Sequence, residues 1–242
     1  MSKLSSSILY AAAAALGSSA PSAAQAPASV PRPTSESAVP TYLPGHRLGQ
    51  ASAPVTLTEY VSYTCGHCQH FARDASPLIK SAYVTPGRVA VEVQHVVRDP
   101  LDFAMVVAVN CGPAAGFGAR HDAMMAEAPN LLARVRALPS STLEAWQATA
   151  IDKRSKRIAD DTGITAWMRA RGTTNAAIEA CFADRAFQQR IVALSAASAD
   201  AGVDSTPMFA INRRLLSGVH DWSALRPALE QALTRPPAGN RR

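Results

Sequence analysis

The stretch "EYVSYTCGHCQHF", residues 59–71, places two of the four cysteines in the chain three positions apart, around a Gly-His pair. Cysteines at this spacing can bind a metal, form a structural disulfide or cycle between a dithiol and a disulfide. The preceding residues 55–63 are rich in Val, Thr and Tyr and predict a β-strand. The residues from Cys68 onward carry apolar side chains at helical spacing. We therefore expect Cys65 where a strand ends and a helix begins.

This position favours redox chemistry at Cys65. A helix N-terminus offers unpaired N–H groups and a partial positive charge, which stabilise a thiolate. A free thiol has a pKa near about 8.5, and a helix N-terminus or a protonated histidine lowers it. We expect Cys65 to be the nucleophile, supported by the charge of His67, and Cys68 to be the buried thiol that resolves a mixed disulfide. Gly66 would let a substrate backbone approach closely.

In the predicted strand, Glu59 lies on the same face as Val55, Leu57 and Val61, because every second side chain points the same way. Its side chain is therefore expected to face the core. A buried carboxylate is unfavourable unless it has a function. We expect Glu59 to accept or supply the proton of Cys68 during thiol exchange. The alternative is a solvated glutamate at the edge of the sheet.

Metal binding is the competing interpretation of the cysteine pair. Four potential ligands stand close together in the sequence: Cys65, His67, Cys68 and His70. Structural zinc needs four ligands at suitable spacing, but the sequence has no second CxxC or HxxxH motif. We therefore expect no metal and no other cofactor, and a metal-binding module remains the less favoured alternative.

The N-terminus predicts export. Residues 1–26 contain Lys3, an apolar stretch over 8–16 and an Ala-x-Ala pattern at 24–26, which is the layout of a secretory signal peptide. The apolar stretch is too short to span a bilayer. We expect the mature protein in the periplasm, where disulfides persist. The alternative is an alanine-rich disordered leader.

The remaining chain predicts one α/β domain with a helical insertion. Residues 88–97 alternate as a strand, "PMFAIN" and "RRLLSG" at 207–218 read as a hairpin, and 221–234 read as a closing helix despite Pro227. The expected segments are a Pro/Ser-rich linker at 27–49, an α/β domain formed by 50–100 and 203–234, an all-helical insertion at 101–202 and a disordered tail at 235–242.

The net charge of +6 does not by itself indicate nucleic-acid binding. The densest basic run, residues 152–157, has no interleaved aromatic residues, and Asp160 and Asp161 follow it. This pattern favours a solvated helix face, and we expect no nucleic-acid partner.

With these features together, the chain resembles the thioredoxin superfamily, and more closely the DsbA-like thiol:disulfide oxidoreductases exported by Gram-negative bacteria. The resemblance covers residues 50–234 and rests on "EYVSYTCGHC" (59–68), "VVRDPLDF" (96–103) and "GVDSTPMFAIN" (202–212). In that family the late Thr-Pro motif has a cis proline that lies against the active-site disulfide. The resemblance therefore implies that Thr206 and Pro207 form the substrate groove, where the backbone of Thr206 pairs with a substrate strand.

The resemblance also implies a function and partners. A DsbA-like enzyme donates disulfides to unfolded or reduced exported polypeptides and is reoxidised by a quinone-linked membrane partner. Many such enzymes carry Pro-His between their cysteines, whereas Gly66-His67 is typical of protein disulfide isomerases. An isomerase or reductase of the same fold therefore stays an alternative. We expect a monomer, because the sequence shows no dimerisation segment.

Cys111 and Cys181 remain outside the CGHC motif. By resemblance to proteins of some bacterial groups, they are expected to form a structural disulfide within the helical insertion. The alternative is two free, buried cysteines.

Overall fold

The computed structural model describes residues 46–234. The predicted signal peptide, most of the predicted linker and the predicted tail lie outside the described residues. The folded part begins earlier than the linker boundary at residue 49 predicts, because His46 is already buried and Arg47–Leu48 form strand β1. The ring of His46 bonds the carbonyl oxygen of Val93 and the side chain of Asn110, both at 2.8 Å.

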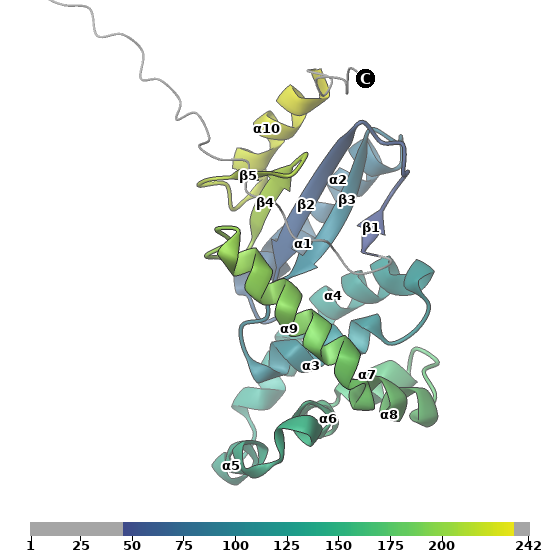
Figure 1. Ribbon diagram of the computed structural model, residues 1–242, viewed down its shortest axis with the longest axis vertical. Coiled ribbons are helices and arrows are strands. Elements are labelled where there is room, and N and C mark those ends of the chain that lie inside the picture. The colour runs from purple at the N-terminus through teal and green to yellow at the C-terminus, as the bar shows by residue number, and fades with distance from the viewer. Residues whose placement is uncertain (1–45, 235–242) are drawn as a thin grey trace, which may run out of the picture. The chain divides into compact units, whose positions relative to one another are not determined.

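The centre of the fold is a five-stranded sheet with the order β1-β3-β2-β4-β5 (Figure 1). Its strands are β1 (Arg47–Leu48), β2 (Val55–Val61), β3 (Val89–His95), β4 (Met208–Ile211) and β5 (Arg214–Leu216). Strands β2 and β3 are parallel, and the other neighbouring pairs are antiparallel. The predicted hairpin is therefore present as β4 and β5.

A parallel pair needs a crossover connection, which here consists of helices. Between β2 and β3 lie α1 (Gly66–Asp74), α2 (Ser76–Ile79) and a π-helical turn (Lys80–Val84). Helix α10 (Trp222–Thr234) packs against β2 and β4 through its buried residues Leu225 and Leu229. Pro227 lies inside this helix, which continues through it.

Between β3 and β4 the described chain is helical and contains no strand. Its helices are α3 (Pro100–Asn110), a 3-10 turn (Ala114–Gly116), α4 (Phe117–Arg136), α5 (Ser140–Ala148), α6 (Ile151–Thr162), α7 (Ile164–Arg169), α8 (Asn175–Ala183) and α9 (Arg185–Asp200). Figure 1 shows α3 to α8 gathered at one end of the sheet, with α9 returning toward it. This arrangement confirms the predicted thioredoxin-like fold with a large helical insertion.

Helix α3 is the buried centre of the insertion. It packs against α4, α6, α7 and α8, and eight of its residues are buried. Helix α3 is the first element after β3, and β2 and β3 end side by side. The helix at the centre of the insertion therefore begins close to the end of β2.

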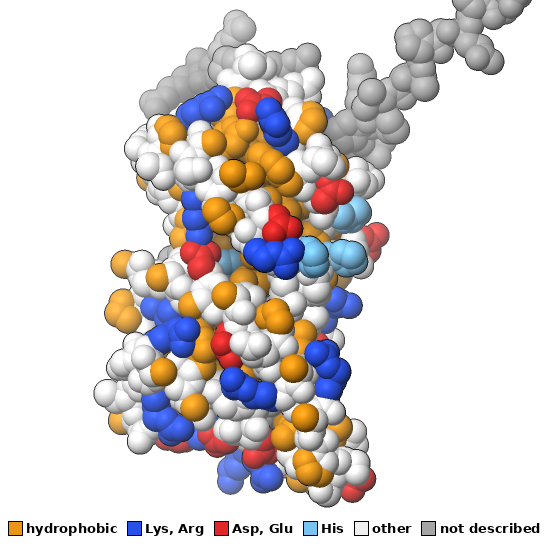
Figure 2. Space-filling view, turned by 180° about the vertical axis from the view of Figure 1, so that it is seen from behind, with side chains coloured by type: hydrophobic (Ala, Val, Ile, Leu, Met, Phe, Trp, Pro, Cys, Tyr) orange, Lys and Arg blue, Asp and Glu red, His pale blue; other side chains and the backbone are white. Residues whose placement is uncertain are grey.

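The basic run of residues 152–157 lies on α6 and pairs with acidic side chains one turn later. Lys156 bonds Asp160 and Arg157 bonds Asp161. Figure 2 shows Lys and Arg side chains interspersed with Asp and Glu on the face that it presents. Within residues 46–234, no helix is long and apolar enough to cross a membrane.

Candidate active site

Cys65 is the N-cap residue of α1, with an extended backbone conformation (φ −87°, ψ 115°). Its side chain is only 4% exposed. Sγ donates a hydrogen bond to the carbonyl oxygen of Thr206 at 3.1 Å. The structure therefore brings the β2–α1 corner together with the loop before β4.

The two thiols of the CGHC motif have opposite pKa shifts. A hydrogen bond with the Cys68 thiol is the largest cause that lowers the pKa of Cys65 to about 4, and the backbone N–H groups of Cys68 and His67 add to it against the effect of burial. The hydrogen bond to Cys65 and burial raise the pKa of Cys68 well above its usual range. Both cysteines are free in this structure. Of the two thiols, Cys65 is thus the one that ionises first, losing the proton that it donates to Thr206, and Cys68 keeps its proton.

The residues between the cysteines face outward. Gly66 and His67 are exposed, and a Cβ placed on Gly66 would meet nothing within 4 Å. The space beside Gly66 is therefore open to a substrate chain. The contribution of His67 that the structure shows is its backbone N–H, whereas the sequence interpretation assigned this role to its imidazole. Figure 2 shows histidine side chains beside Lys or Arg and Asp or Glu side chains on one part of the surface.

The loop beside the cysteines contains a cis Thr206–Pro207 peptide bond. The carbonyl of Thr206 accepts from Cys65, and the carbonyl of Pro207 is hydrogen-bonded to His220 Nδ1 at 2.9 Å. The hydroxyl of Thr206 is buried without a partner among the described residues, so it is available to bond a thiolate. Sequence reasoning did not single out His220, because a lone histidine after a hairpin gives no pattern.

Glu59 lies on the central strand β2 and is 5% exposed, so the alternative of a solvated edge glutamate is wrong. Burial raises the pKa of its carboxyl to about 7, although the charge of Lys80 opposes the shift. Glu59 lines a pocket of ≈ 380 Å³ together with Lys80, His121 and Asp122, of which Lys80 and Asp122 form an ion pair. The buried carboxyl of Glu59 therefore lies at the wall of a pocket that also contains charged side chains.

The possible metal ligands of the motif do not converge. His70 lies on the surface, where its ring contacts Arg73 and Asp74. Among residues 46–234, no group of three or more His, Cys, Asp or Glu side chains is arranged to hold a metal ion.

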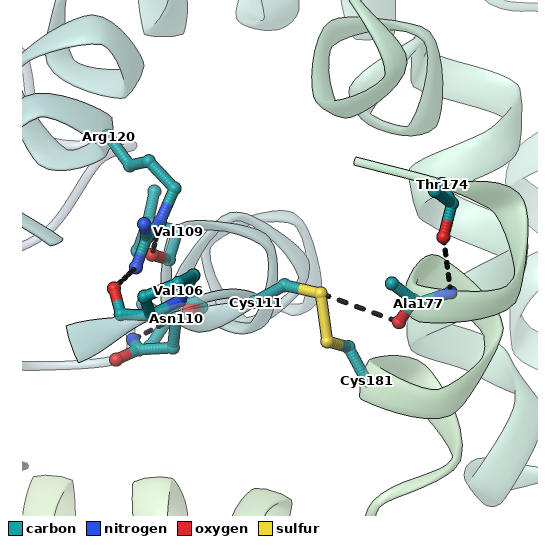
Figure 3. Close-up of a disulfide and its surroundings, with 9 residues drawn as sticks. Val106, Val109, Asn110, Cys111, Arg120, Thr174, Ala177 and Cys181 are labelled. Atoms are coloured by element: carbon teal, nitrogen blue, oxygen red, sulfur yellow. Dashed lines mark hydrogen bonds between the residues drawn. A yellow bond between two sulfur atoms is a disulfide. The ribbon is translucent and has the colours of Figure 1, made fainter. Parts of the chain in front are cut away.

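Cys111 and Cys181 are joined in a disulfide, with their Cα atoms 5.7 Å apart (Figure 3). Cys111 is the C-cap residue of α3 and Cys181 lies within α8. Close to Cys111, Arg120 of α4 donates a hydrogen bond to the carbonyl oxygen of Val109 on α3 at 2.7 Å. The bridge thus ties two helices of the insertion, away from the CGHC motif in sequence.

A cluster of buried histidines lies near the active-site loop and was not predicted. The hydroxyl of Tyr63 is hydrogen-bonded to His121 Nδ1 at 2.8 Å and to His95 Nε2 at 3.0 Å. The ring of His46 packs edge-on against His95, with centroids 5.2 Å apart. Burial lowers the pKa of all three histidines, so the cluster is uncharged in the folded protein.

Comparison with known proteins agrees with this geometry. Residues 41–231 match the family model described as thioredoxin. A search of curated proteins gave no match. A solved protein-disulfide isomerase from Novosphingobium aromaticivorans has 31% sequence identity and a TM-score of 0.72, over 78% of this chain and 97% of that chain.

Two more distant structures share the fold. The α-DsbA1 of Wolbachia pipientis has 19% identity and a TM-score of 0.59, over 78% of this chain and 90% of that one. BdbD from Bacillus subtilis has 16% identity and a TM-score of 0.56, over 78% and 93% of the two chains.

The fold and the paired thiols together define a thiol:disulfide oxidoreductase. This chain belongs to the thioredoxin family, and it shares its fold with the solved α-DsbA1 and BdbD structures.

Proposed function

We propose that this enzyme is exported to the periplasm and donates the Cys65–Cys68 disulfide to reduced polypeptides. The main support for this proposal is that the pKa of Cys65 is lowered while the pKa of Cys68 is raised. A thiolate that is stabilised at Cys65 stabilises the dithiol form, and this makes the disulfide form a stronger oxidant.

In the proposed reaction, a substrate thiolate attacks Sγ of Cys65 in the disulfide form. The Cys65–Cys68 bond breaks, and the Cys68 sulfur leaves and takes up a proton that Glu59 supplies. A second substrate thiolate then attacks the substrate sulfur of the mixed disulfide and releases Cys65 as a thiolate. Two electrons pass from the substrate dithiol to the enzyme. A quinone-linked membrane partner is proposed to accept them when it reoxidises the enzyme.

The buried position of Glu59 supports its role as the proton donor, because a carboxyl with a pKa of about 7 can both give and accept a proton near neutral pH. The open space at Gly66 and the backbone of Thr206 support a groove for an extended substrate chain. Metal binding by the CGHC motif is not favoured by this arrangement.

A disulfide isomerase is the second candidate function. Two observations favour it: the Gly66-His67 dipeptide, and the solved relative at 31% identity that is described as a protein-disulfide isomerase. An isomerase uses the same Cys65 thiolate, but its cysteines must be kept reduced.

The reduction potential separates these candidates. We expect the Cys65–Cys68 couple, equilibrated with glutathione buffers, to lie above about −180 mV, since strong oxidants of this fold reach about −120 mV and reductases lie near about −270 mV. Oxidation of a reduced substrate protein and repair of a scrambled one should be compared in parallel, with Cys65→Ser as the inactive control. A potential near that of the reductases, or faster repair than oxidation, would contradict the oxidase proposal.

Export is tested separately. The protein should be recovered from the periplasm without its first residues, as intact-mass measurement would show. A mature protein that retains Met1 would contradict cleavage of a signal peptide.

A further inference from the structure

The three residues before Cys65 are held by a helix of the insertion. Ser62 Oγ donates to Asp102 Oδ2 at 2.6 Å, and the backbone N–H of Tyr63 donates to Asp102 Oδ1 at 2.9 Å. The backbone N–H of Arg98 also donates to Asp102 Oδ2, at 3.1 Å. One carboxylate on α3 therefore fixes the start of the loop that leads from β2 to the nucleophile.

A second carboxylate on the same turn holds the end of this loop. Thr64 Oγ1 donates to Asp99 Oδ2 at 2.6 Å, while Asp99 Oδ1 accepts the backbone N–H of Asp102 at 2.9 Å. Asp99 is thus both the N-cap of α3 and an anchor for the residue directly before Cys65.

The role of Asp102 is not helix capping. Asp99 already caps α3, and the side chain of Asp102 points to the loop of residues 62–64 instead. Asp102 is fully buried, at 0% exposure, and burial raises the pKa of its carboxyl to about 6. A carboxylate kept away from water and without an ion pair is unfavourable unless its hydrogen bonds serve a purpose.

The held loop determines where the Cys65 sulfur lies. The backbone N–H of Cys65 donates to the carbonyl oxygen of Ser62 at 3.3 Å, so the position of Ser62 sets the backbone of Cys65. Cys65 must have this position for its sulfur to meet the N–H groups of His67 and Cys68, which stabilise the thiolate.

We infer that Asp102, assisted by Asp99, is a positioning residue that fixes Cys65 at the N-terminus of α1 and so sets its thiolate character. This inference rests on the proposed role of Cys65 as the attacking thiol, but it holds for an oxidase and an isomerase alike. It also gives the helical insertion a direct part in the chemistry, because its first turn supplies both carboxylates.

The sign of the effect distinguishes positioning from simple electrostatics. Removing a nearby negative charge would favour the thiolate and lower the pKa of Cys65 further. Loosening the loop would move the sulfur away from the N–H groups and raise the pKa of Cys65. A residue that only stabilises the fold would leave the pKa of Cys65 unchanged.

The test measures the alkylation rate of Cys65 against pH in the reduced full-length protein, with peptide mapping to assign the modified thiol. Asp102→Asn keeps the shape but turns an N–H donor toward the N–H of Arg98. We expect the titration midpoint of Cys65 to rise by about one unit, which lowers the alkylation rate below the midpoint roughly tenfold. The reduction potential should fall in parallel.

Thr64→Val is the second variant, because it removes the bond to Asp99 and leaves the cap of α3 intact. Thr64→Val should raise the titration midpoint of Cys65 by a smaller amount than Asp102→Asn. If Asp102→Asn does not fold, Thr64→Val alone tests the inference. Asp184→Ala is the control, since Asp184 caps α9 by accepting from the N–H of Phe187 at 2.9 Å and alanine removes this cap. It should lose stability without moving the midpoint of Cys65.

Each outcome decides the matter. An unchanged or lowered midpoint in Asp102→Asn, or in Thr64→Val if Asp102→Asn does not fold, overturns the inference. An ordinary thiol midpoint in the unsubstituted protein would instead contradict the proposed role of Cys65, so the two failures are distinguishable.

Discussion

The thiol of Cys65 donates a hydrogen bond to the carbonyl oxygen of Thr206, a residue 141 positions later in the chain, at 3.1 Å. The whole helical insertion lies between these two residues in sequence. The active site is therefore complete only when both parts of the thioredoxin-like domain have come together, and a peptide containing the CGHC motif alone would lack half of it.

The first prediction concerns the pair of cysteines. Cys68→Ser should accumulate mixed disulfides on Cys65, because the resolving thiol is lost, and Cys65→Ser should abolish exchange.

The hydrogen bond with Cys68 is the largest cause of the low pKa of Cys65. Cys68→Ala should therefore raise the pKa of Cys65, whereas Cys68→Ser keeps a donor and should raise it less. Alkylation rates against pH with mass mapping measure both effects. If Cys68 is alkylated before Cys65 in the reduced protein, the assignment is reversed.

The second prediction concerns the buried carboxyl of Glu59. Its folded pKa of about 7 lies above the ordinary glutamate pKa of 4.5, so the folded state favours the protonated form. The stability that this gives is fully present below pH 4.5 and is lost as pH rises through 7. Glu59→Gln should thus be more stable than the unsubstituted protein at pH 8, by on the order of 3 kcal/mol, and about equal to it at pH 4.5.

The measurement is the free energy of unfolding in denaturant at both pH values. Glu92→Gln is the matched control, because Glu92 pairs with Arg47 at 2.5 Å on the neighbouring strand and should lose stability at pH 8. Thiol exchange should be slower in Glu59→Gln, since the proton donor is gone. Exchange rates equal to those of the unsubstituted enzyme would show that Glu59 moves no proton in the reaction.

The third prediction separates the two cysteine pairs by their lability. The bridge between Cys111 and Cys181 spans 70 positions, and in the chain-entropy model such a link contributes about 4 kcal/mol to stability. Replacing both residues with Ala should lower the free energy of unfolding by up to this amount and leave the pKa of Cys65 unchanged. After mild reduction, peptide mapping should find Cys65 and Cys68 alkylated and the other pair still linked. Free thiols at Cys111 and Cys181 in protein purified without reductant would contradict a permanent bridge.

Much of the fold could be predicted because its signals are local. The Val/Thr/Tyr run before the CGHC motif predicts β2, and the alternation within it places Glu59 on a buried face. The absence of strand patterns over 101–202 predicts the helical insertion. The start of the fold could not be predicted in this way, because His46 and Arg47–Leu48 join it through a side-chain bond and backbone pairing that leave no apolar pattern.

The contacts between distant elements could not be predicted from single residues. Asp102 lies 40 positions after Ser62, and an acidic residue after Asp-Pro indicates only the first turn of a helix. His46 precedes β1, His95 ends β3 and His121 lies on α4, and each looks like an isolated histidine in the sequence. Only the packed structure places His95 and His121 against Tyr63, with His46 against His95.

The buried histidines should make the protein sensitive to acid. Burial lowers the pKa of His121 to about 3, from the ordinary histidine pKa of 6.5, with smaller contributions from His46 and Lys80. The unfolded chain therefore binds a proton at this residue that the folded protein does not. The resulting stability is present above pH 6.5 and is lost as pH falls from 6.5 toward 3, on the order of 5 kcal/mol in total.

Glu59 acts in the opposite direction between pH 4.5 and 7, so the test uses the Glu59→Gln background. There, His121→Asn should keep a partner for the Tyr63 hydroxyl and should reduce the loss of stability between pH 6 and pH 5 by about 1.4 kcal/mol. The Glu59→Gln protein that keeps His121 is the control. Urea unfolding at each pH gives the free energies. An equal loss of stability with and without the His121 substitution would show that this histidine is already protonated, or is not buried, in the folded protein.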